Sequence, residues 1–147
     1  MFEIFRGKKI IVTGHTGFKG SWLVAFLSTY GCRIYGLSKD LPSNPSHYSL
    51  LNLTKKIKNY KVDITDQKKI KKIIHKIQPD FVFHLAAQSL VKTSYNHPML
   101  TFNSNSIGTL NILESLRYLK KKLSVILITS DKSYKNLEIK RGYKETD

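Results

Sequence analysis

Three glycines at intervals of three residues, Gly14, Gly17 and Gly20, form the first pattern in the sequence that could do chemistry. They follow an apolar run at residues 9–12 and precede a segment whose apolar residues recur at helical spacing. A turn of this kind suits a dinucleotide pyrophosphate, because the first amides of the helix and its dipole favour negative charge. We expect Gly14 to make the tight turn, Gly17 to admit the phosphates and Gly20 to let the helix pack on the strand. The spacing is not the more common Gly-x-Gly-x-x-Gly, so a turn without a ligand is the alternative.

A second chemical stretch, Thr129, Ser130, Asp131 and Lys132, follows an apolar run at residues 123–128. A hydroxyl, a carboxylate and an amine together at the end of a buried strand are candidates for acid–base catalysis. Ligands of an open parallel sheet bind beyond the carboxyl ends of its strands, where both this stretch and the glycine turn are expected. A polar turn without a catalytic role is the alternative.

These candidates need a scaffold, and the sequence predicts alternating strands and helices. The predicted strands cover residues 9–12, 33–38, 60–64, 81–87 and 123–128, and the predicted helices begin near residues 18, 65 and 105. We expect Gly31 to end the first helix and Thr65 or Asp66 to cap the second. Residues 41–60 are expected to form a loop with a short helix, and residues 88–104 a loop containing Pro98. The unbroken apolar character of the fourth strand is typical of burial on both faces. The pattern predicts an α/β fold, a Rossmann-type doubly wound parallel sheet.

Residues at other predicted strand ends could complete a cofactor site. Ser38 could bond an adenosine ribose hydroxyl, with Asp40 two residues further on. No arginine that would favour a 2′-phosphate follows, although Lys39 is close, so we expect NAD rather than NADP. Asp63 could accept a bond from the adenine amino group, with Ile64 against the ring. Roles confined to the loops remain alternatives for both aspartates.

Three further features bear on the site. His15 and Lys19 flank the glycine turn, where Lys19 could add positive charge. Ala86 and Ala87 leave room for a cofactor at the end of the fourth strand. We expect His84, inside that strand, to be structural, and the five histidines show no metal-ligand spacing.

Composition narrows the classes of protein. The 147 residues are enough for one domain, and 41% of them are hydrophobic. The net charge of +15 raises nucleic acid as a partner, but isoleucines at residues 70–77 form one apolar stripe that turns the neighbouring lysines toward solvent. With no nucleic-acid-recognition signature, we expect a solvated basic surface. The single cysteine, Cys32, fits a reducing cytoplasm, and neither a signal peptide nor an apolar run long enough for a membrane span is evident.

Together these residues resemble the extended short-chain dehydrogenase/reductase family, and within it the CDP-glucose 4,6-dehydratase group. The resemblance runs along the whole sequence and is carried by residues 13–22, 63–64, 84–88, 105–109, 129–132 and 142–147. It implies NAD as cofactor and a nucleotide-diphosphate sugar, CDP-glucose, as substrate. The implied cofactor-binding residues are Gly14, Thr16, Gly17, Phe18, Lys19, Gly20, Ser38, Asp63, Ile64, Leu85, Ala86, Ala87, Asn105 and Thr129.

The resemblance also implies a chemistry: oxidation at C4 of the sugar, loss of water across C5 and C6, and return of the hydride to C6. Ser130 would bond the C4 oxygen, and Asp131 would protonate the departing C6 hydroxyl. Lys132 stands where dTDP-glucose dehydratases carry a glutamate, and would help to remove the C5 proton. As a base it needs a lowered pKa, and pairing with Asp131 is its alternative role.

One family feature has no match at the expected place. The main base of the family is a tyrosine four residues before a lysine, on the helix after the fifth strand. Here Tyr35 and Lys39, and Tyr118 and Lys122, have the spacing but not the position. We therefore expect an NAD-binding amino-terminal portion, residues 1–147, with a sheet truncated after the fifth strand, no substrate domain and no activity alone.

Other interpretations stay open. The chain could be the dinucleotide-binding module of a split enzyme, acting with a complementing carboxyl-terminal chain or as a homodimer. It could also be a related nucleotide-sugar epimerase or dehydratase, or a basic nucleic-acid binder.

Overall fold

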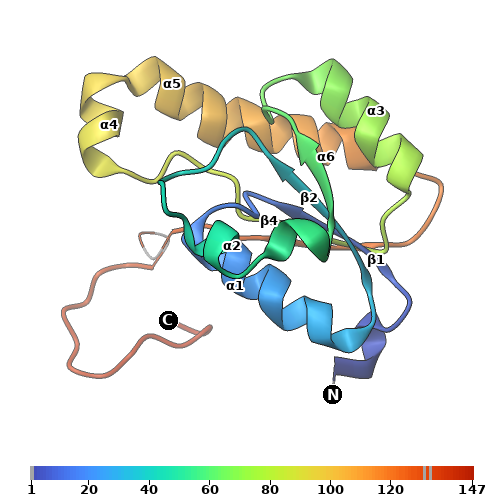
Figure 1. Ribbon diagram of the computed structural model, residues 1–147. Helices are drawn as coiled ribbons and strands as arrows, with labels where there is room; N and C mark the ends of the chain where they lie inside the picture. Colours follow the sequence, from blue (N-terminus) through green and yellow to red (C-terminus); the bar gives the residue numbers. More distant parts are fainter. Residues whose placement is uncertain (1, 131, 133) are drawn as a thin grey trace.

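The computed structural model describes residues 2–130, 132 and 134–147, and its centre is a parallel five-stranded sheet with helices on both faces (Figure 1). The strands are β1 (Lys9–Thr13), β2 (Arg33–Ser38), β3 (Lys58–Lys61), β4 (Phe81–His84) and β5 (Ser124–Leu127). Their spatial order is β3-β2-β1-β4-β5, so the chain reverses its direction of travel between β1 and β4. Ligands bind at such a switch point in doubly wound sheets. The predicted Rossmann-type fold is confirmed.

Helices cover both faces of the sheet. The α-helices are α1 (Phe18–Leu27), α2 (His47–Leu50), α3 (Gln67–Ile77), α4 (Val91–Asn96), α5 (Pro98–Phe102) and α6 (Gly108–Arg117). Shorter turns are the 3₁₀ helices η1 (Phe2–Phe5), η2 (Ser28–Tyr30) and η3 (Leu53–Lys55), and the π turn η4 (Asn103–Ile107). In Figure 1, α1 and α2 lie below the sheet, and α3 and α6 lie above it. None of the helices in the described part of the chain is long and apolar enough to cross a membrane.

The alternation of side chains along β1 divides the core in two. Ile10 and Val12 pack with Val24 and Leu27 of α1 on one face of the sheet. Ile11 packs on the other face, in a cluster formed by isoleucines of α3 and α6. Both β1 side-chain sets are fully buried, so β1 is the strand that joins the two halves of the core.

Several predicted boundaries are confirmed. Gly31 follows η2 with a φ of 64°, the left-handed conformation that a glycine accepts without strain. Asp66 caps α3, its carboxylate accepting from the Lys69 amide at 3.1 Å. The predicted isoleucine stripe of α3 is buried at Ile70, Ile74 and Ile77.

Two predicted strands end elsewhere. The third was predicted at residues 60–64 but covers Lys58–Lys61, because its partner β2 ends at Ser38. The Val62 amide makes the last bond to the Ser38 carbonyl, at 2.9 Å. The fourth was predicted at residues 81–87 but ends at His84, beyond which the backbone amides turn to a side chain of β1.

The loop predicted at residues 88–104 is wrong, because most of this segment is helical. Pro98 begins α5, where the missing N–H of a proline costs no helical hydrogen bond. The π turn η4 then carries the chain into α6 without a break. The regular α-helix therefore starts at Gly108 rather than near residue 105.

Close approach of α1 to β1 depends on Gly20. A Cβ built at Gly20 would collide with the carbonyl oxygen of Gly14 and lie 2.8 Å from the Cα of His15. Both obstacles are backbone atoms, so no side-chain rotation relieves the contact. The predicted packing role of Gly20 is confirmed.

Replacing Gly20 with alanine should therefore destabilise the fold by about 2 kcal/mol or more, as overpacking does. Urea unfolding monitored by circular dichroism measures this. The matched control is Gly142→Ala, since a Cβ at Gly142 meets no atom within 4 Å. Equal midpoints for the two variants would contradict the packing role.

Candidate functional site

The glycine turn forms a cradle at the start of α1. Gly14 has a φ of 68°, and a Cβ there would lie 2.8 Å from the Cα of Ala86. Gly17 is the residue before α1, and no side chain caps the helix at that point. The amides of the first turn are therefore turned outward without a side-chain acceptor, which makes this end of α1 a site for an anion.

A chain of hydrogen bonds ties the ends of β1 and β4 to α6. The Thr109 hydroxyl donates to the Asn105 carbonyl at 2.7 Å, so it must accept from Nε2 of His84, 2.9 Å away. Nδ1 of His84 then accepts from the Thr13 hydroxyl at 2.7 Å. The Thr13 oxygen in turn accepts from the amides of Leu85 and Ala86, both at 3.1 Å.

This chain requires His84 to be neutral. Burial lowers the pKa of its imidazole from the ordinary 6.5 to about 4. A second proton on Nδ1 would face the Thr13 hydroxyl, which would have to turn its own proton away. The prediction of a structural histidine is confirmed, and its task is to fix the backbone at Leu85 and Ala86, beside the glycine turn.

Asn105 extends the same support. Its side-chain oxygen accepts from the Gln88 amide at 2.7 Å, and its amide donates to the Gln88 carbonyl at 2.9 Å. The segment that follows β4 is thereby held at both ends, by Thr13 and by Asn105. Ala86 and Ala87 lie between these anchors, at the carboxyl edge of the sheet.

His15 takes a different position from the one expected beside the phosphates. Its ring is buried against Gly36, where a Cβ would lie 2.5 Å from the imidazole. Nε2 donates to the side-chain oxygen of Asn59 at 2.7 Å, an oxygen that also accepts from the Tyr48 hydroxyl. Burial lowers the pKa of His15, although the hydrogen bond to Asn59 opposes the shift.

The hydrogen bond from His15 to Asn59 determines whether the Ser38 hydroxyl donates to His15 or accepts from it. Because Nε2 of His15 is the donor, Nδ1 accepts from the Ser38 hydroxyl at 2.9 Å. The Ser38 proton is thus committed to His15, and the serine oxygen, which accepts from the Thr16 amide at 3.4 Å, has one acceptor position left. An acceptor at the end of β2 suits a hydroxyl donor such as an adenosine ribose.

Two ion pairs stand beside Ser38. Lys39 pairs with Asp63 at 3.1 Å, and Lys61 pairs with Asp40 at 3.6 Å. Partial burial disfavours the charged form of Asp63, but hydrogen bonds from Thr65 and Lys39 outweigh it and lower its pKa. Both lysines at this end of the sheet are therefore already matched by carboxylates.

Ile64 is wedged beneath α6. A Cβ at Gly108 would lie 2.5 Å from Cδ1 of Ile64, so the helix backbone rests on this side chain. The Asn111 side chain donates to the carbonyls of Ile64 and Thr65, at 3.0 and 3.1 Å. A side-chain amide of α6 thus fixes the segment after β3, as the side-chain amide of Asn105 in η4 fixes the segment after β4.

The candidate residues after β5 lie at the same edge of the sheet. The Ile128 amide donates to the His84 carbonyl at 3.1 Å, which places Thr129 and Ser130 just beyond the last ladder bond. Ser130 and Lys132 are exposed, and the Lys132 amide donates to the Ser130 hydroxyl at 3.2 Å. Asp131 lies outside the described residues.

Near the glycine turn, the remaining candidates are accessible. Phe18 is 68% exposed and Lys19 is exposed, both in the first turn of α1. The Thr16 hydroxyl donates to the Asp40 carbonyl at 2.7 Å, which links the turn to the loop after β2. The cofactor candidates thus converge on one edge, from the turns after β1 to β5 and from η4.

The two chance tyrosine–lysine pairs lie elsewhere, as expected. Tyr118 follows α6, and its ring contacts Lys71 and Arg117 rather than any strand end. Tyr35 lies within β2 and packs against the core. Neither tyrosine reaches the glycine turn.

Sequence reasoning missed the supporting residues Asn59 and Thr13. Asn59 meets His15 across 44 residues of chain, and nothing in the sequence indicates that pairing. Thr13 and His84 did carry a signal, because each is a polar residue at the end of an apolar run. Polar residues at the ends of adjacent parallel strands are candidates for bonding to each other.

Comparisons with known proteins agree with this geometry. The family model described as GDP-mannose 4,6 dehydratase matches residues 11–147. The CDP-glucose 4,6-dehydratase of Salmonella typhimurium is 40% identical over 145 residues, which are 99% of this chain and 40% of that protein.

Solved structures show the same relationship. The epimerase Mth375 of Methanothermobacter thermautotrophicus matches with a TM-score of 0.82 and 28% identity, over 99% of this chain and 42% of its own. The UDP-glucose 4-epimerase of Thermus thermophilus, solved as a complex with NAD, gives a TM-score of 0.65 and 32% identity, over 74% of this chain and 33% of its own. The chain spans about 40% of the length of the curated relative and of the first of these structures.

The neutral histidines predict a pH dependence of stability. Below pH 6.5 the unfolded chain protonates His84, whereas the folded chain does not until about pH 4. The unfolded state thus binds more protons in this window, and His84 should lower the free energy of unfolding by about 1.4 kcal/mol for each unit by which the pH falls. Below about pH 4, His84 adds nothing further to the slope.

Urea unfolding between pH 4 and 7 tests this. His84→Gln should flatten the slope by about one proton. Parallel curves for the native chain and His84→Gln would show that His84 is protonated in the folded protein.

Proposed function

Because the chain belongs to the GDP-mannose 4,6-dehydratase family of extended short-chain dehydrogenases/reductases, we propose that residues 1–147 are the NAD-binding domain of a nucleotide-sugar 4,6-dehydratase. The observation that carries the proposal is the uncapped start of α1 beneath a glycine turn whose backbone approaches Ala86. That cradle fits a pyrophosphate, and its shape needs glycine at positions 14 and 20, because a Cβ at either would collide with the backbone of Ala86 or of Gly14.

Each part of NAD finds matching groups along the edge. The pyrophosphate would lie on the first turn of α1, with Lys19 adding positive charge. The ribose of adenosine would donate to the Ser38 oxygen, which His15 holds as an acceptor. The adenine would lie between Asp63 and Ile64.

The nicotinamide half would lie over the other strand ends. Leu85, Ala86 and Ala87 would line it after β4, with Thr129 after β5 and Asn105 from η4 completing the wall. Bound NAD supplies the hydride acceptor for oxidation at C4 of the sugar. The rigid hold on this wall by Thr13 and Asn105 supports the assignment, because a hydride donor and acceptor need fixed positions.

Three residues after β5 are proposed for the chemical steps. Ser130 would donate a hydrogen bond to the C4 oxygen as that carbon becomes a ketone. Asp131 would give its proton to the C6 hydroxyl as it leaves, and Lys132 would help to remove the proton from C5. The C5–H electron pair then forms the C5–C6 double bond, so the elimination releases one water molecule.

The proposed substrate is CDP-glucose. Its support is the 40% identity to the CDP-glucose 4,6-dehydratase of Salmonella typhimurium, over 145 residues of this chain. Nothing within residues 1–147 is proposed to recognise the cytosine base. We place the protein in the cytoplasm, with a second copy or a complementing chain as its partner.

A nucleotide-sugar epimerase is the second candidate. It is favoured by the two solved structures described above, both of epimerases. Both functions oxidise the sugar with NAD, so the cradle does not separate them. The product does, since a dehydratase releases a 4-keto-6-deoxy sugar and an epimerase returns a hexose with its hydroxyl inverted.

NAD binding is the first test. Calorimetric titration of the chain should show saturable binding, and Gly17→Asp should weaken it at least tenfold by placing a carboxylate at the pyrophosphate. The matched control, Gly142→Asp, adds the same charge to the exposed carboxyl-terminal segment and should leave the affinity unchanged. Equal affinities for the two variants would refute the cradle.

The preference for NAD is a separate prediction. NADP should bind at least tenfold more weakly, because Lys39 and Lys61 are already paired with carboxylates and Ser38 presents an acceptor to the 2′ position. The same titration with NADP measures the ratio. Equal affinity would mean that one of these lysines leaves its carboxylate to bind the 2′-phosphate.

For residues 1–147 alone, we expect no conversion of CDP-glucose in the presence of NAD. The physical reason is the position of Tyr35 and Tyr118, neither of which reaches the glycine turn to act as the base. Chromatography of the nucleotide sugars after incubation measures this. A 4-keto-6-deoxy product would show that Lys132 or another group replaces the tyrosine.

A further inference from the structure

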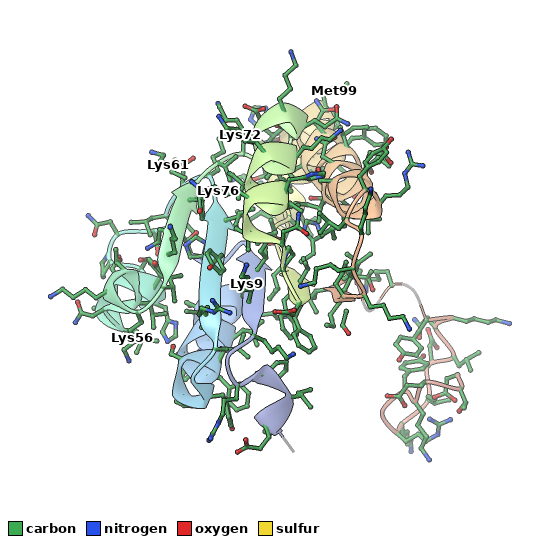
Figure 2. All side chains as sticks on the ribbon, turned by 90° about the vertical axis from the view of Figure 1, so that its right-hand side faces the viewer. Lys9, Lys56, Lys61, Lys72, Lys76 and Met99 are labelled. Atoms are coloured by element: carbon green, nitrogen blue, oxygen red, sulfur yellow. The ribbon has the colours of Figure 1, made fainter. Side chains whose placement is uncertain are left out.

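A hollow of about 460 Å³ opens at the amino-terminal ends of β2 and β3, at the opposite edge of the sheet from the glycine turn. Four cationic residues line it: Arg33, Lys55, Lys56 and Lys58. Tyr35 and Ile57 also line it, each packed against the core on a different face of the sheet. Figure 2 shows that Lys56 lies toward one end of β3 and Lys61 at the other, so this hollow is separate from the proposed ribose site.

The positive charge of the hollow is not balanced locally. Within residues 2–130, 132 and 134–147, the ion pairs that are formed involve none of its four cations. The Arg33 guanidinium donates to the Gly7 carbonyl at 3.0 Å, a neutral acceptor. Asp40 and Asp63, the aspartates nearest to these cations in the sequence, form ion pairs with Lys61 and Lys39 at the other end of β3.

Protection of the sheet edge explains only part of this arrangement. Lysines on an outermost strand discourage pairing with another chain, which accounts for Lys58 and Lys61 of β3. Arg33 belongs to β2, an inner strand, and Lys55 and Lys56 come from the turn before β3. Edge protection gives no reason for these three side chains to line the same hollow.

We infer that this hollow binds a triphosphate group. Four cations match the charge of a triphosphate, and gathering them around one hollow costs repulsion that such an anion removes. The arginine fork suits two phosphate oxygens at once, and the lysines act as point charges. The group can come from inorganic triphosphate or from a nucleoside triphosphate, because the two share the phosphate chemistry that the cations recognise.

This site is independent of the proposed NAD site, and the test keeps them apart. Titrations use the Gly17→Asp background, in which the glycine turn is closed to phosphates, and NAD binding is measured separately on the native chain. Failure of one site therefore leaves the other interpretable. Circular dichroism confirms that each variant is folded before it is titrated.

Calorimetric titration with inorganic triphosphate at about 0.15 M salt, where surface charges are screened beyond about 8 Å, is the experiment. The site variant is Lys55→Glu/Lys56→Glu/Lys58→Glu. The control is Lys68→Glu/Lys72→Glu/Lys76→Glu, which makes the same change in net charge on the exposed side of α3, where Figure 2 shows Lys72 and Lys76. We expect the site variant to lose affinity at least tenfold and the control to lose no more than about threefold.

Equal losses in the two variants would overturn the inference, because the binding would then follow the net charge of +15 rather than the hollow. Absence of saturable binding to the Gly17→Asp chain would overturn it as well. ATP identifies the source of the group: tighter binding than inorganic triphosphate assigns a nucleoside triphosphate. Equal binding assigns the phosphates alone.

Discussion

A neutral histidine holds the functional edge of this sheet together. His84 accepts a hydrogen bond from the Thr13 hydroxyl and donates one to the Thr109 hydroxyl, so one imidazole links β1, β4 and α6. The same Thr13 oxygen fixes the amides after β4, and Ala86 then rests against Gly14. The shape of the glycine turn therefore depends on the protonation of a residue that would not touch the cofactor.

Charge is distributed unevenly between the two edges of the sheet. At the carboxyl edge, lysines beside β2 and β3 stand in ion pairs with Asp40 and Asp63, so the adenosine end of the site is close to neutral. At the amino edge, the cations around Arg33 have no such partners among the described residues. The positions of the few carboxylates therefore say more about where an anion can bind than the net charge of the chain does.

The sequence was sufficient for features set by local chemistry and insufficient for those set by distant neighbours. Glycine spacing, the isoleucine stripe of α3 and the Asp66 cap are local, and each was predicted correctly. Strand ends are not local, because β3 stops where β2 stops. The prediction placed Pro98 in a loop, although a proline fits the first turn of a helix equally well.

Within the candidate site, the chemistry-bearing positions were predictable and their supports were not. Ser38 was foreseeable from its place at a strand end. The direction of its hydrogen bond depends on Asn59, which lies on β3 and contacts His15 although the two residues are 44 positions apart in the chain. The close approach of Ile64 to the backbone of Gly108 has a consequence for how the sequence can evolve. A larger residue at 108 requires the Ile64 side chain to move or to shrink, so the two positions should vary together as a covarying pair.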